Sequence, residues 1–158
     1  GFTVSKKLEK MGWWASDTAE LTFEDCRVPT ANLLGEENGG FFAIMTNFAT
    51  ERLFLASQCV AIAELAYREA VAFAKDRRVF GKSVMAFQVT RHKLADMASR
   101  LAAARALTGE VAVRHLRGEA IPSLVAMAKN VATDMVTYVC DQAVQIHGGA
   151  GYMREYTV

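Results

Sequence analysis

The sequence predicts a mainly α-helical protein, an antiparallel helical bundle preceded by a short β-structured segment. Only 2 of the 158 residues are proline, while Ala, Leu and Val are frequent, a composition that favours long helices. From Phe41 onward, apolar residues recur at three- and four-residue steps, the period of a helix with one buried face. Residues 17–28 instead alternate apolar and polar side chains, the period of a strand.

Composition and charge exclude several classes of protein. Lys and Arg number 18 against 17 Asp and Glu, so no broad basic field supports binding to nucleic acid or to an anionic membrane. No apolar run approaches the roughly 20 residues of a membrane span. Cys26, Cys59 and Cys140 lack the spacing of a disulfide framework or a zinc site, which fits a reducing cytoplasm or organelle matrix.

Residues 1–40 are expected to be the end of a β domain and a linker loop. Ala19, Leu21 and Phe23 lie on one face of the predicted strand, followed after a slip by Cys26 and Val28. Residues 29–40 begin with proline and are rich in turn formers, which indicates a loop. One strand cannot bury its own face, so we expect the rest of this β domain to lie outside the chain.

Residues 41–158 are expected to form three helices of roughly 25–35 residues joined by short connections, an antiparallel bundle. The breaks fall at residues 77–82, 118–122 and 148–151, and Pro122 suits the first turn of the third helix. Such bundles usually close with a fourth helix, so we expect this domain to be truncated, with an apolar seam that associates into a dimer or higher oligomer. The expected buried stripes are Leu55, Cys59, Ile62, Ala66 and Phe73; Leu94, Met97, Leu101, Ala104 and Val111; and Leu124, Ala128, Val131, Met135 and Val139.

Three segments have both a structural and a chemical interpretation. Residues 148–151, Gly-Gly-Ala-Gly, could stop a helix or cradle a phosphate, although they follow a helix and are not a Rossmann motif. The cations of residues 75–82 either complement a helix dipole or bind an anion. Glu51-Arg52 interrupts an apolar stretch, either as solvated charges at a helix kink or as a carboxylate that an apolar pocket turns into a general base.

Taken together, the motifs resemble those of the acyl-CoA dehydrogenase family over essentially the whole chain. Phe23-Glu24-Asp25, Arg27-Val28-Pro29 and residues 34–41 (LGEENGGF) resemble the end of that family's middle β domain. Glu51-Arg52-Leu53, residues 77–82 (RRVFGK), Gln88 and residues 145–152 (QIHGGAGY) follow in the order and spacing of its C-terminal helical domain. Glu51 directly before Arg52 resembles the long-chain and isovaleryl-type branch.

This resemblance implies an enzyme that uses FAD to introduce an α,β double bond into a fatty acyl-CoA thioester, as in fatty acid β-oxidation. A base removes the α-proton while the β-hydrogen leaves as hydride to flavin N5. It further implies electron-transfer flavoprotein as electron acceptor, a homo-oligomer built as a dimer of dimers, and a bacterial cytoplasm or mitochondrial matrix as location. Because the residues that hold the flavin ring lie outside this chain, we expect the isolated segment to be inactive and colourless.

The resemblance also assigns roles to individual residues. Glu51 takes the place of the catalytic base, although relatives carry it either there or in a segment that would lie beyond Val158. Phe42 and Arg52 correspond to substrate-binding positions, with Arg52 behind the base. Arg77 corresponds to an arginine that reaches the pyrophosphate of a neighbouring subunit's FAD. The implied cofactor-binding residues are Arg77, Phe80, Gln88, Gln145, Ile146, His147, Gly148 and Gly149.

Other interpretations remain open at this stage. Relatives often have arginine where this chain has Trp14, and the effect of that departure is open. An acyl-CoA oxidase or a flavin monooxygenase on the same fold would differ in the oxygen reactivity of its reduced flavin. A non-catalytic helical assembly module would need neither Glu51 nor Arg77.

Overall fold

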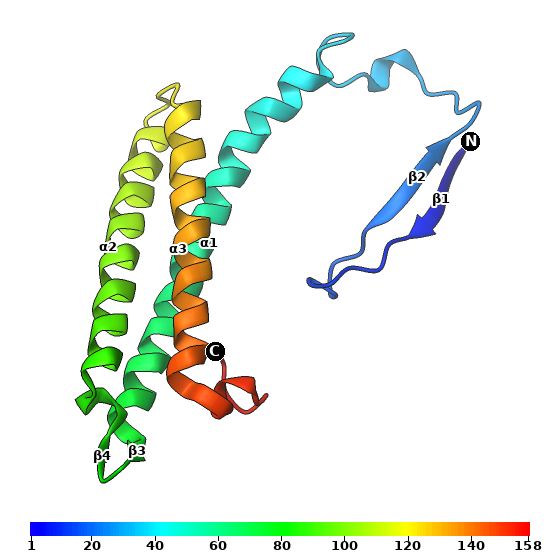
Figure 1. Cartoon of the computed structure of the whole chain (residues 1–158). Helices are drawn as coiled ribbons and strands as arrows, with labels where there is room; N and C mark the ends of the chain where they lie inside the picture. The colour runs from blue at the N-terminus through cyan, green and yellow to red at the C-terminus, as the bar shows by residue number, and fades with distance from the viewer. The chain divides into compact units, whose positions relative to one another are not determined.

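The computed structural model describes all residues, 1–158, and its long elements are helices (Figure 1). Helix α1 spans Gly40–Asp76, α2 spans Gln88–Leu116 and α3 spans Pro122–His147, which confirms the predicted fold class. Contacts divide the chain into residues 1–43 and 44–158, and each unit is described by itself. No helix has the length and apolar character needed to cross a membrane.

The first unit contains an antiparallel pair of strands rather than one strand. Strand β1, Phe2–Lys7, pairs with β2, Ala19–Phe23, with an irregularity between Val4 and Lys6. The predicted strand therefore ends at Phe23, before Cys26 and Val28, and a short 3-10 turn follows at Thr30–Asn32. The face expected to be buried is open, because Leu21 and Phe23 are both exposed and only the Phe2 ring lies against Phe23, 5.2 Å between centroids.

In the second unit, the end of α1, the start of α2 and the end of α3 lie at the same end of the bundle (Figure 1). A small hairpin joins α1 to α2, with β3 at Arg78–Val79 and β4 at Lys82–Ser83. Its two turn residues, Phe80 and Gly81, have φ of 50° and 79°, the left-handed pair that a tight hairpin turn requires. A 3-10 turn at Val84–Ala86 follows the hairpin, and another at Gly148–Tyr152 follows α3.

The buried faces of α2 and α3 follow the helical period. All five predicted core residues of α2 are buried, from Leu94 to Val111, and Pro122 occupies the first turn of α3 as expected. On α3 the prediction is wrong at Val131, which is 41% exposed, while Ala132 beside it is fully buried. One residue rotates a helix by about 100°, so the buried face of α3 passes through Ala132 and not through Val131 at this turn.

On α1 the predicted stripe is wrong at two of its five positions. Leu55 and Ile62 are 43% and 53% exposed, Cys59 and Phe73 are half-buried, and Ala66 is buried. Helix α1 carries two apolar stripes, and α2 and α3 cover only one of them. The covered stripe consists mostly of small side chains. The buried residues of α1 are Leu53, Ala56, Val60, Ala63, Ala66, Ala70 and Ala74.

Candidate functional site

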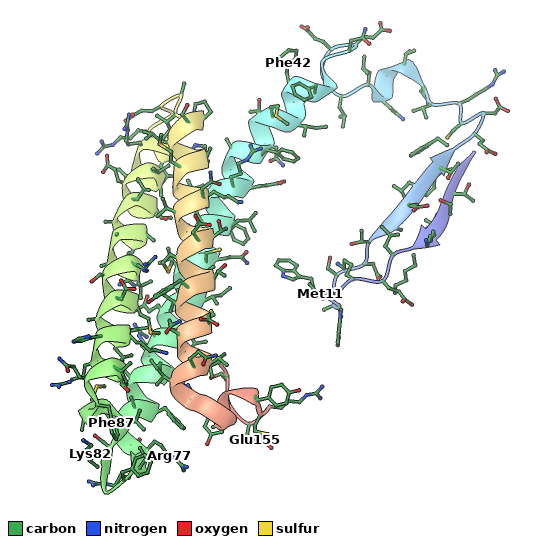
Figure 2. All side chains as sticks on the ribbon, in the orientation of Figure 1. Met11, Phe42, Arg77, Lys82, Phe87 and Glu155 are labelled. Carbon is green, nitrogen blue, oxygen red and sulfur yellow. The ribbon has the colours of Figure 1, made fainter.

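The first group of candidate residues surrounds the hairpin at one end of the bundle (Figure 2). Arg77 directly follows α1 and is exposed, and its backbone N–H donates to the Phe73 carbonyl at 2.9 Å. Phe80 stands at the hairpin tip, 95% exposed, and Gln88 is the exposed first residue of α2. The structure therefore presents a guanidinium, a ring and an amide to solvent at this end of the bundle.

The second group, at the end of α3, divides into outward- and inward-facing residues. Gln145 is exposed, whereas Ile146 and His147 are only 9% and 5% exposed. His147 Nδ1 lies 2.8 Å from the Ala143 carbonyl, so this nitrogen carries the proton and donates it. The imidazole stacks on the Phe73 ring, 4.3 Å between centroids, and thereby ties the end of α3 to α1. The side chains of Ile146 and His147 thus belong to the core.

The glycine-rich segment ends the helix, which agrees with its structural interpretation. Gly148 caps α3 with φ of 58°, a conformation that favours glycine. A Cβ at Gly151 would lie 2.8 Å from the Val144 carbonyl oxygen, so the chain turns tightly against the last turn of α3. At Gly148 and Gly149, by contrast, a Cβ would meet nothing within 4 Å, so this stretch of backbone is open to a ligand.

These residues fit an anionic dinucleotide such as FAD by their donor set. The Arg77 guanidinium suits a pyrophosphate, the Gln88 and Gln145 amides suit a sugar or base, and the open backbone at Gly148 allows close approach.

A hollow that includes Gln88 lies on the surface of α2 and α3. The side-chain hydrogen bond with Tyr138 lowers the pKa of Asp96, and the same bond raises the pKa of Tyr138. The Arg100 guanidinium lies 4.1 Å from the centroid of the Tyr138 ring. The hollow is lined by Gln88, Val89, His92, Lys93, Asp96 and Tyr138.

The third group surrounds Glu51, near the N-terminal part of α1. The helix continues through Glu51-Arg52 without a break, and Glu51 is exposed, so no apolar pocket encloses it within this chain. Its Oε1 accepts a hydrogen bond from Asn47 Nδ2 at 2.5 Å. Arg52 does not pair with Glu51; its guanidinium lies 5.4 Å from the centroid of the Phe48 ring.

Comparison with known proteins decides the family. Residues 38–158 match the family model described as "Acyl-CoA dehydrogenase, C-terminal domain". The chain belongs to the acyl-CoA dehydrogenase family. An acyl-CoA dehydrogenase of Bacillus subtilis is 46% identical over the whole chain, which covers 42% of that protein. The long-chain specific mitochondrial acyl-CoA dehydrogenase of Rattus norvegicus is 40% identical over the whole chain, which covers 37% of it.

Solved structures agree with this membership. A probable acyl-CoA dehydrogenase from Mycobacterium abscessus superposes with a TM-score of 0.91 at 49% identity, over 99% of this chain and 42% of that one. A structure named "Electron transferring flavoprotein of Acidaminococcus fermentans" matches with a TM-score of 0.91 at 43% identity, over 99% of this chain and 41% of that one. The chain thus spans about two fifths of the length of the acyl-CoA dehydrogenases it matches.

Within this acyl-CoA dehydrogenase domain, the structure separates the candidate residues into two places. Glu51 and Arg77 are 26 residues apart along one continuous helix and its end, which corresponds to about 39 Å at 1.5 Å per residue. Arg77, Phe80, Gln88 and residues 145–149 share one end of the bundle, and Glu51 lies far from them. Most of the length of α1 therefore separates the two places.

The residues beside Glu51 were not singled out from the sequence. Asn47 and Phe48 each lie one turn before the charged residue that they contact, and Thr50 Oγ1 lies 3.3 Å from His115 Nε2 on α2. The contacts of Asn47 and Phe48 could have been predicted from the sequence, because side chains four residues apart on a helix are neighbours. The Thr50–His115 contact joins residues 65 positions apart and has no local signal.

Proposed function

We propose that the protein containing this chain dehydrogenates acyl-CoA thioesters at the α,β position, with FAD as cofactor and Glu51 as the base. The observation that carries the proposal is the exposed Glu51 carboxylate on α1 of a family-member domain, where it makes no ion pair. Membership of the family and the names of the relatives support dehydrogenase chemistry.

The proposed role of Glu51 is to accept the α-proton of the thioester. Such a proton is weakly acidic, so its acceptor must be within hydrogen-bond reach and shielded from water. Oε1 is held by Asn47, while Oε2 accepts no hydrogen bond from the chain and is free to take the proton. Large exposed apolar side chains flank the carboxylate and would exclude water once the substrate covers them; they include Ile44, Phe48, Phe54 and Leu55.

The residues proposed to hold FAD are those at the hairpin end of the bundle. Arg77 would contact the pyrophosphate, Phe80 and Gln88 would lie beside it, and Gln145 with the backbone of Gly148 and Gly149 would lie along the adenosine. When bound, FAD supplies the two-electron acceptor for the β-hydrogen. Because Glu51 lies about 39 Å from Arg77 along the chain, we assign these two residues to different copies of FAD in a homo-oligomer.

We further propose electron-transfer flavoprotein as the electron acceptor, and the bacterial cytoplasm or the mitochondrial matrix as the location. The match to the Acidaminococcus fermentans structure supports this acceptor. The rat relative, whose name includes the word mitochondrial, supports the second of these locations.

The test of the proposed function is Glu51→Gln in the full-length, flavin-loaded protein. The amide is nearly isosteric but cannot accept the proton, so flavin reduction by acyl-CoA should slow by at least about 10²–10⁴-fold. Anaerobic stopped-flow absorbance measures this rate apart from product release. Glu69→Gln, an exposed glutamate on the same helix, is the matched control and should leave the rate unchanged. A Glu51→Gln protein with the wild-type rate would assign the base to another residue.

The oxidase alternative is tested on the same protein after reduction. A dehydrogenase should be reoxidised rapidly by electron-transfer flavoprotein and slowly by dissolved oxygen. Rapid reoxidation by oxygen alone, with stoichiometric hydrogen peroxide, would replace the dehydrogenase assignment by an oxidase.

A further inference from the structure

We propose that Asn47 is a positioning residue that fixes the carboxylate of Glu51 for proton transfer. The inference rests on the proposed role of Glu51 as the base and adds the group that orients it. Asn47 lies one helical turn before Glu51, so the two side chains project from the same face of α1. Its Nδ2 donates to Glu51 Oε1 at 2.5 Å, which leaves Oε2 as the oxygen that meets substrate.

The helical turn that carries Glu51 is itself held in place. Leu53, two residues on, is buried against Val111 and Val125 in a small core cluster at this level of the bundle. Thr50, one residue before, contacts His115 of α2 through its hydroxyl at 3.3 Å. The backbone under Glu51 is thus fixed by packing, and the remaining freedom lies in the rotamers of the glutamate side chain. The Asn47 hydrogen bond is the contact that restricts them.

Charge distinguishes Asn47 from the other candidate partner of Glu51. The resemblance to the family implies that Arg52 lies behind the base, and in the structure its guanidinium lies over the Phe48 ring. Two contacts of the same spacing therefore run side by side on α1, Asn47 to Glu51 and Phe48 to Arg52. The carboxylate is oriented by a neutral donor and not by an ion pair, so its negative charge is not neutralised by the group that holds it.

The expected size of the effect follows from the geometry of proton transfer. A reacting group displaced by about 1 Å can lose on the order of 10²-fold in rate. A glutamate freed from its hydrogen bond samples several rotamers, of which few present an oxygen to the α-carbon. We expect loss of the Asn47 amide to slow the proton-transfer step by about 10–100-fold without changing how acyl-CoA binds.

The experiment compares Asn47→Leu, Asn47→Gln and Glu51→Gln in the full-length, flavin-loaded protein. Leucine keeps the approximate size of asparagine without a donor, and glutamine restores the amide. Asn130→Leu, an exposed asparagine on α3, is the matched control. The first readout is the rate of flavin reduction and the Kd of acyl-CoA, obtained together from the substrate dependence in the stopped flow.

The second readout isolates proton abstraction from the redox step. 3,3-Dimethylbutyryl-CoA has no hydrogen on its β-carbon, so the enzyme can exchange its α-hydrogens with D2O but cannot dehydrogenate it. Mass spectrometry measures the exchange. Asn47→Leu should lower exchange and flavin reduction by the same factor with an unchanged Kd, Asn47→Gln should recover part of both, and Asn130→Leu should match wild type. Flavin content and melting temperature verify that the variants are folded.

The outcomes separate this inference from the proposed function. If Glu51→Gln abolishes exchange while Asn47→Leu exchanges at the wild-type rate, Glu51 is the base and the positioning role of Asn47 is wrong. If Asn47→Leu weakens acyl-CoA binding and leaves the rate at saturation unchanged, Asn47 binds substrate instead. If Glu51→Gln keeps full exchange, the base lies elsewhere and both proposals fail. In the double variant, the loss should equal that of Glu51→Gln alone, because without the carboxylate nothing remains to position.

Discussion

Helices α1 and α2 carry apolar residues with the same helical period, yet only α2 buries every residue that the period selects. On α2 the stripe from Leu94 to Val111 is buried against its neighbours, whereas on α1 two residues of the stripe, Leu55 and Ile62, face outward. The buried face of α1 is mostly alanine. When a helix has one apolar stripe, its sequence predicts which face is buried. When it has two, the neighbouring helices decide which of them is buried.

The largest expected effect comes from introducing charged residues into the exposed apolar stripe of α1, which includes Ile62 and Leu65. Ile62→Glu combined with Leu65→Glu should weaken self-association by at least about 3 kcal/mol, since burying each such side chain contributes about 1.5–3 kcal/mol. Sedimentation should then show smaller species than wild type. The same two charges placed at the exposed Ala102 and Ala103 of α2 form the control. An unchanged assembly would show that this stripe is not an association surface.

The next comparison exchanges small and large residues between the two buried faces. Met97→Ala on α2 should cost about 2–5 kcal/mol, because a fully buried side chain leaves a cavity. Ala63→Leu on α1 should cost about 1–3 kcal/mol, because the fully buried alanine has no space for three more carbons. Denaturant unfolding measures both changes. A neutral Ala63→Leu would mean that α1 lies farther from its neighbours than its burial indicates.

The smallest effect concerns the charged link between the same two helices. Glu64 of α1 holds Arg68 on its own helix and Arg105 on α2. Because both arginines are largely exposed, Arg105→Ala should cost only about 0.2–1 kcal/mol, and less at high salt. Urea unfolding at low and high ionic strength measures this. Arg91→Ala, an exposed arginine of α2 without an ion pair, is the reference, and an equal loss in both variants would exclude a specific contribution of the pair.

The parts of the fold that depend on local patterns could be predicted from the sequence. The helical period located three helices, Pro122 marked the start of the third, and the glycines after His147 marked its end. Strand β1 was missed because its polar second half, Ser5-Lys6-Lys7, lacks an apolar period, and its partner lies a dozen residues away. The hairpin at Phe80-Gly81 was recognised only as a break, since phenylalanine rarely adopts a positive φ.

The candidate site also has features that the sequence predicts and features that it does not. Motif resemblance identified Arg77, Gln145 and Glu51 as residues of interest, but it does not specify where a side chain points. His147 lies inside a motif that the resemblance assigns to the cofactor, and its ring stacks on Phe73 while its Nδ1 donates to the Ala143 carbonyl. Arg52 likewise contacts Phe48 rather than Glu51. Such contacts follow from tertiary placement and from rotamers, which no motif encodes.

The length of helix between Glu51 and Arg77 has a consequence for inheritance. Under the proposed assignment, each copy of the chain supplies the base to one flavin and the arginine to another. Consider a mixed dimer of a Glu51→Gln subunit and an Arg77→Ala subunit, each inactive when paired with itself. One of its two sites contains both substitutions. The second site receives an intact Glu51 from the Arg77→Ala subunit and an intact Arg77 from the Glu51→Gln subunit. Two recessive alleles of this gene would therefore complement each other, and a mixed population of subunits would regain activity that neither parent possesses.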